Sequence, residues 1–139
     1  MTLKPIVPLL LAAACLPARA QQLEPGEWEF NSTSTSQLFP GPQSASFKRC
    51  IRKEEAANPD QWMGKPDPSG DCKLTPVKKT ADTYSWEMEC PKAKMRGTGS
   101  ARMTRGTMEG ETSMTGEVQG RKFDLRTKVT GKRLGPCKN

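Results

Sequence analysis

Two segments of the chain alternate apolar and polar residues at every second position. In residues 83–90 the apolar side is formed by Tyr84, Trp86, Met88 and Cys90. In residues 123–130 the corresponding side is formed by Phe123, Leu125, Thr127 and Val129. Successive side chains of a β-strand point to opposite faces of the sheet, so this period predicts two half-buried strands with these residues facing inward.

Weaker strand patterns, separated by turns, fill most of the remaining chain. Residues 27–31 alternate around Trp28 and Phe30, and the Ser/Thr stretch that continues to residue 36 is suited to an edge strand. Three further extended segments are predicted over residues 44–51, 95–104 and 107–118. The turn residues that bound them are Pro40-Gly41-Pro42, Arg105-Gly106 and Gly120.

Strands repeated at a spacing of roughly 10 to 12 residues are typical of all-β folds. We therefore expect an antiparallel meander that forms a curved sheet or a partly open barrel. Residues 53–57 have a helix-forming composition, but Pro59 limits them to a short helical segment. The residues expected to form the thin core, or to line a pocket in it, are Trp28, Phe30, Trp86, Met88, Phe123 and Leu125.

The first 20 residues have the organisation of a secretory signal peptide. Lys4 gives a positive start, residues 6–16 are apolar, and Ala18-Arg19-Ala20 predicts cleavage between Ala20 and Gln21. Residues 21–139 then form a single β-rich domain without a transmembrane segment, in the periplasm or secreted. The alternative is a lipoprotein, because residues 11–15 resemble a lipidation motif ending at Cys15.

Removal of this leader changes the composition. The formal net charge falls from +7 to +5, because Lys4 and Arg19 are lost. Leu, Ile, Val and Phe together number only 13 in residues 21–139, about 11% of them. That fraction is below the roughly 20% at which disorder becomes plausible, so the apolar core alone would be marginal.

Four cysteines of the exported domain offset this shortage. Cys50, Cys72, Cys90 and Cys137 are an even set behind an export signal, which predicts two disulfides. The favoured pairs are Cys50 with Cys72 and Cys90 with Cys137, with the two other pairings left open. A zinc site is disfavoured, because the chain has no histidine and no Cys-x-x-Cys pair.

No catalytic, cofactor or metal site is predicted. Histidine, the commonest general acid or base near neutral pH, is absent. The carboxylate pairs Glu87 with Glu89 and Glu109 with Glu111 alternate with inward residues, which favours a solvated sheet face. Met103, Met108 and Met114 could bind copper(I) through their thioethers, but core packing is the favoured role, because methionine is a common core residue.

The order of several short motifs resembles an exported bacterial family, the domain of unknown function 3617. The motifs are Pro25-Gly26-Glu27-Trp28-Glu29, Cys50 with the polar segment after it, Asp71-Cys72-Lys73, Ser85-Trp86-Glu87-Met88-Glu89-Cys90, the Thr/Gly/Met-rich hairpins, and Gly135-Pro136-Cys137. The resemblance implies a periplasmic or secreted β-rich domain whose function is not established.

Three hypotheses for function follow, in order of preference. The first is a non-enzymatic domain that binds a small apolar ligand or a component of the cell envelope in a pocket of the curved sheet. The dispersed basic pairs, such as Lys48-Arg49 and Arg121-Lys122, extend this to an anionic envelope surface, whereas an exported protein rarely meets nucleic acid. The second is an interaction module that pairs through an edge strand, with residues 30–36 as the candidate, and the third is an enzyme of unknown type.

Overall fold

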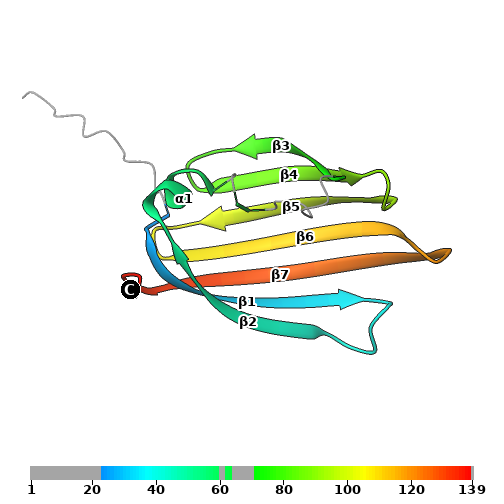
Figure 1. Cartoon of the computed structure of the whole chain (residues 1–139), viewed down its shortest axis with the longest axis horizontal. Coiled ribbons are helices and arrows are strands. Elements are labelled where there is room, and N and C mark those ends of the chain that lie inside the picture. The colour runs from blue at the N-terminus through cyan, green and yellow to red at the C-terminus, as the bar shows by residue number, and fades with distance from the viewer. Residues whose placement is uncertain (1–22, 60–61, 64–70, 139) are drawn as a thin grey trace, which may run out of the picture.

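The strands of the protein form one open antiparallel sheet (Figure 1). The computed structural model describes residues 23–59, 62–63 and 71–138. The elements in chain order are β1 (Gly26–Ser36), β2 (Gln43–Ile51), α1 (Lys53–Ala57), β3 (Lys73–Lys79), β4 (Thr83–Cys90), β5 (Met95–Met103), β6 (Thr107–Val118) and β7 (Arg121–Gly135). The expected leader, with its cleavage site at Ala20 and Gln21 and the alternative lipidation site Cys15, lies outside the described residues.

The strand order across the sheet is β2-β1-β7-β6-β5-β4-β3. Strands β3 to β7 form a meander in which each strand pairs with the next, and the β1–β2 hairpin is added beside β7. This confirms the all-β antiparallel fold with one short helix. The prediction that residues 30–36 form an edge was wrong, because they lie in β1 between β2 and β7. A Ser/Thr-rich composition does not reveal how many neighbours a strand has.

One end of the inner face carries the buried core of the described residues. The core cluster is formed by Leu23, Trp28, Phe30, Ile51, Ala56, Met63, Tyr84, Trp86, Ala101, Met103 and Met108. Figure 1 shows α1 at this end of the sheet, and its Ala56 packs into the cluster. The opposite end of the sheet carries the β1–β2, β4–β5 and β6–β7 turns (Figure 1).

Four of the six residues expected in the core are buried. Trp28 and Phe30 are 0% and 2% exposed, and Trp86 and Phe123 are 7% and 8% exposed. The other two, Met88 and Leu125, are half-buried. Residues of 83–90 alternate as predicted, since Tyr84, Trp86 and Cys90 are buried and Glu87 and Glu89 are not.

Glycines make room for two of the large rings. Gly99 lies directly opposite Trp86, and Gly131 lies directly opposite Phe30. A Cβ atom on Gly99 would lie 2.2 Å from the Trp86 ring, and one on Gly131 would lie 2.7 Å from the Phe30 ring. The rings therefore lie flat over the neighbouring strand, which lets a small sheet bury large aromatic surfaces.

The N-terminus of α1 is capped by Glu55. The backbone N–H of Arg52 donates a hydrogen bond of 2.9 Å to Glu55 Oε2, and Arg49 forms an ion pair with the same carboxylate. The indole N–H of Trp62 donates to the Glu55 carbonyl oxygen, and the Arg49 guanidinium lies 5.0 Å from the Trp62 ring centroid. These contacts tie the end of β2, α1 and Trp62 together over the sheet.

Both disulfides form, but the favoured pairing was wrong. The bonded pairs are Cys50 with Cys137 and Cys72 with Cys90, with Cα–Cα distances of 5.4 Å and 4.1 Å. The pairing follows from the strand order. Glu27 pairs with both Cys50 and Gly135, which brings the C-terminal segment to β2, and Lys73 pairs with Glu89, which brings Cys72 to Cys90.

Candidate functional site: a pocket where two hairpins separate

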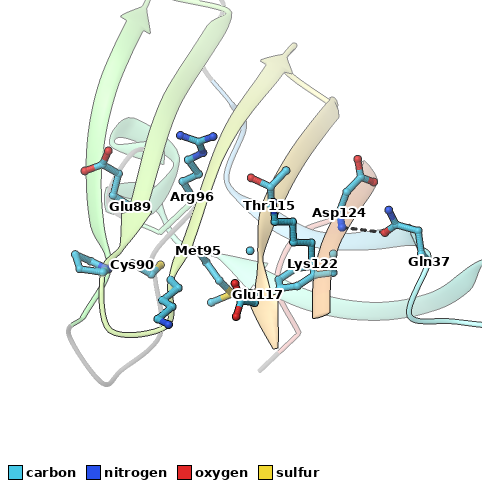
Figure 2. A pocket seen from close by; sticks show the side chains of 13 residues that line it. Gln37, Glu89, Cys90, Met95, Arg96, Thr115, Glu117, Lys122 and Asp124 are labelled. Atoms are coloured by element: carbon cyan, nitrogen blue, oxygen red, sulfur yellow. Dashed lines mark hydrogen bonds between the residues drawn. The ribbon is translucent and has the colours of Figure 1, made fainter. Parts of the chain in front are cut away.

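An open pocket in the described part of the chain lies where β5 and β6 stop pairing. The β5–β6 ladder ends at Arg96 opposite Thr115, whereas β6 continues to Val118 and turns into β7. The β6–β7 hairpin therefore extends beyond the end of β5. The space beside this extension is an open pocket of about 720 Å³ (Figure 2).

The floor of the pocket is apolar. A Cβ atom on Gly116 would lie 2.7 Å from Cγ of Met95 and 2.8 Å from Cε1 of Phe123, so both side chains lie against this glycine. Phe123 is buried and Met95 is half-buried. Cys90, held in the disulfide with Cys72, lines the same pocket. An apolar part of a ligand would be shielded from water on this floor.

The rim of the pocket is charged and balanced. It carries three cations and three carboxylates, contributed by Lys94, Arg96, Lys122, Glu89, Glu117 and Asp124. Glu89 is directly opposite Arg96, and Glu117 is directly opposite Lys122. Even so, none of the three cations lies within 4.0 Å of a carboxylate of the described residues. The rim charges are therefore available to a ligand.

The β1–β2 turn closes the pocket on one side. The Gln37 side-chain oxygen accepts a hydrogen bond of 2.9 Å from the backbone N–H of Asp124, drawn as the dashed line in Figure 2. Lys94 ends the β4–β5 turn with a φ of 50°, in the left-handed region. Figure 2 also shows Met95, Glu117 and Lys122 together at the centre of the site. The β1–β2 turn, the β4–β5 turn and the strands of the β6–β7 hairpin thus surround the pocket.

A smaller hollow of about 310 Å³ adjoins this pocket and shares Glu89, Arg96 and Thr115 with it. Met88 and Gly97 form its base, and Glu87 stands beside Glu89 at its border. The carboxylate pair that the sequence singled out therefore faces an open hollow on the polar side of the sheet. Glu109 and Glu111 line a separate shallow hollow together with Arg102 and Lys128.

The residues expected to line a pocket are divided between the two ends of the sheet. Phe123 lines the main pocket and Met88 lines the smaller hollow. Trp28, Phe30 and Trp86 instead pack into the core cluster at the other end. Met95, Gly116, Lys94 and Arg96 were not predicted from the sequence, and Lys122 was singled out only as part of a dispersed basic pair. The signal that could have found them is the unequal length of the predicted strands 95–104 and 107–118, because a longer strand must extend beyond its neighbour.

Neither a candidate metal cluster nor a membrane-spanning helix is found among the described residues. They contain no group of three or more His, Cys, Asp or Glu side chains that could hold a metal ion. All four cysteines among them are in disulfides. The single described helix, α1, has five residues, so no helix in this part of the chain is long and apolar enough to cross a membrane.

Two carboxyl groups with shifted pKa values lie outside the pocket. The Arg52 backbone N–H, followed by the Arg49 charge, lowers the pKa of Glu55, with burial acting against them. The Thr80 hydroxyl, helped by Thr83, lowers the pKa of Asp82 in the β3–β4 turn. Both shifts stabilise the ionised carboxylate and are explained by local hydrogen bonds that shape a helix start and a turn.

The fold and the site together define a disulfide-linked all-β domain with an open, charge-rimmed pocket. The chain belongs to the family described as "Protein of unknown function (DUF3617)", whose model matches residues 23–137. The matched segment includes every described strand and both disulfides. No curated protein and no solved structure matches the chain.

Proposed function

We propose that the protein is a non-enzymatic exported domain that binds a small amphipathic ligand in the main pocket. The observation that carries this proposal is the pocket itself, which combines an apolar floor of Met95 and Phe123 with unpaired charges at its rim. Its volume of about 720 Å³ falls within the range of roughly 300 to 1,000 Å³ that small-molecule sites occupy.

The chemistry of the rim indicates the kind of ligand. Its cations and carboxylates are equal in number, so the rim favours a neutral or zwitterionic head group over a strongly charged one. The apolar part of the ligand would lie against Met95 and Phe123. Amphipathic molecules of this kind are components of the cell envelope, and the two disulfides support residence in an oxidising compartment such as the periplasm or the extracellular space.

The lining residues favour binding over catalysis. The chain has no histidine. Thr115 is the only lining residue with a hydroxyl group, and the sulfur of Cys90 is in a disulfide. An activated nucleophile needs a base within hydrogen-bond reach, and the described pocket holds no such pair.

Titration of the exported domain with the uncharged amphipathic dye Prodan tests this proposal. We expect saturable binding to one site. Met95→Glu places a charge on the apolar floor and should weaken the affinity by about tenfold or more, because an unpaired charge loses its hydration when the ligand covers it.

The matched control is Leu134→Glu, the same kind of change at an apolar residue of β7 that does not line the pocket and is 44% exposed. This variant should bind the dye as the wild type does. Equal affinity of Met95→Glu and Leu134→Glu would place the dye elsewhere and refute the assignment.

A further inference from the structure

The two edges of the sheet differ in how they resist the addition of another strand. Strand β3 contains Pro76, which has no N–H to donate, and its pairing with β4 is shifted between Pro76 and Lys78. It also carries Lys73, Lys78 and Lys79. Proline, irregular register and lysine are the features by which natural sheets protect an edge from pairing.

Strand β2 has a more regular edge. It pairs with β1 in unbroken register, from Gly26 opposite Ile51 to Ser34 opposite Gln43, and contains neither proline nor glycine. The residues from Gln43 to Lys48 are all exposed. In an antiparallel strand every second residue directs its N–H and C=O away from the existing partner. No other strand of the described residues pairs with this edge.

A row of aromatic rings runs outward to the same edge. The ring centroids of Trp28 and Phe30 are 6.1 Å apart, and those of Phe30 and Phe47 are 5.3 Å apart, with both pairs stacked. Phe47, the outermost ring, is 51% exposed. Its outer face therefore remains in water, although the rings next to it are buried.

Two copies of the chain could join edge to edge through β2, related by a two-fold axis perpendicular to the sheet. Such an axis places one residue of β2 opposite the same residue of the other copy. The charges of β2 restrict which residue this can be. An axis at Lys48 or Arg49 would oppose like charges, which destabilises a pair of strands. An axis at Phe47 instead places Lys48 opposite Ser46 and Arg49 opposite Ala45, and it pairs β2 over its full length.

The contacts of Arg49 fit the same arrangement. Its side chain is turned toward α1, where it pairs with Glu55 and lies over the Trp62 ring. The charge is thereby neutralised within its own chain, so it does not oppose an incoming strand. The remaining charge, Lys48, lies on the polar face, away from the aromatic row.

We propose that β2 pairs in antiparallel fashion with β2 of a second copy of this chain, with Phe47 opposite Phe47. The two sheets join into one continuous sheet, and the aromatic row of each copy meets that of the other across the two-fold axis. This assembly is independent of the ligand pocket, which lies where β5 and β6 separate.

Sedimentation velocity of the disulfide-linked exported domain tests the assembly. At about 0.1 mM, where an interface of micromolar Kd is saturated, we expect a dimer. Phe47→Lys should give a monomer, because it places two lysines opposite each other. The matched control is Val77→Lys on β3, also at an exposed apolar position, and it should remain a dimer.

A charge-complementation experiment separates the proposed register from a general loss of the interface. Phe47→Lys and Phe47→Glu should each be monomeric alone and form a one-to-one heterodimer when mixed. A monomeric wild type, a dimeric Phe47→Lys, a monomeric Val77→Lys or the absence of a heterodimer in the mixture would each overturn the proposal. Circular dichroism of every variant should match that of the wild type.

Discussion

At the scale of single residues, the inner face depends on small residues as much as on large ones. Trp86 and Phe30 can lie flat only because Gly99 and Gly131 stand opposite them. Gly116 has the same relation to Met95 and Phe123 in the pocket. The period of two in the sequence predicts which large apolar residues face inward. It does not indicate which glycine lies opposite which aromatic ring, because that depends on the register between strands.

Gly99→Ala tests the close packing of Trp86. The added methyl group would lie 2.2 Å from the ring, so the ring or the strand must move. We expect the free energy of unfolding in urea to fall by about 1 to 3 kcal/mol, the usual cost of overpacking. Gly106→Ala, where a Cβ would meet nothing within 4 Å, should change it by no more than about 0.5 kcal/mol. Equal effects at the two positions would contradict this packing.

Glu55 should make the stability of the folded protein depend on pH, in a direction that follows from its pKa. Its pKa is lowered in the folded protein, mainly by the Arg52 backbone N–H. The contribution of its charge to stability is therefore fully present above the ordinary glutamate pKa of about 4.3 and is lost as the pH falls through the lower folded-state value.

Urea unfolding of Glu55→Gln between neutral and acidic pH measures this contribution. At neutral pH the variant should be less stable by no more than about 1 kcal/mol, since solvent partly screens the half-buried carboxylate, and the difference should vanish in acid. Glu54→Gln changes the neighbouring carboxylate, which has no hydrogen bond or ion pair in the described residues, and should show little such dependence. A difference that grows on acidification would contradict the assigned cause.

At the scale of elements, the strands were predictable and their partners were not. Alternation in residues 83–90 and 123–130 identified β4 and part of β7, and Pro59 correctly limited α1. Local patterns, however, do not show that the first hairpin joins the sheet beside the last strand. The favoured disulfides and the predicted edge at residues 30–36 were wrong for this one reason.

The pocket was missed for a related reason. Its position depends on where the β5–β6 ladder ends, and its lining combines strands β4 to β7 with the β1–β2 and β4–β5 turns. Phe123 was correctly placed as an inward residue and lines the pocket. Trp28, Phe30 and Trp86, expected either in the core or around a pocket, pack into the core cluster with Ala56 of α1.

The two disulfides should differ in their access to reductant. Cys90 is 0% exposed, whereas Cys50 is exposed at the edge strand. Thiol–disulfide exchange requires access to a sulfur atom, so mild reduction without denaturant should open Cys50–Cys137 first. Alkylation followed by peptide mapping checks this order. Peptides linked through Cys50 and Cys72, or faster opening of Cys72–Cys90, would contradict the structure.

At the scale of the whole molecule, the sheet divides into a filled end and an open end. The core cluster and α1 occupy the first, and the β1–β2, β4–β5 and β6–β7 turns and the pocket occupy the second. With only 13 Leu, Ile, Val and Phe residues in residues 21–139, the apolar core is small. The disulfides join segments 87 and 18 residues apart, for which loop-closure entropy suggests about 4.5 and 3 kcal/mol. The scaffold can thus remain folded while one end stays available for binding.

The most direct test of the central claim is native mass spectrometry of the protein isolated from its own cellular compartment, with the wild type and Met95→Glu compared side by side. The wild type should carry one bound molecule of a few hundred daltons per chain, roughly what a pocket of this size holds, and Met95→Glu should carry little or none. A wild type without any bound molecule, or equal occupancy of the two proteins, would contradict binding in this pocket.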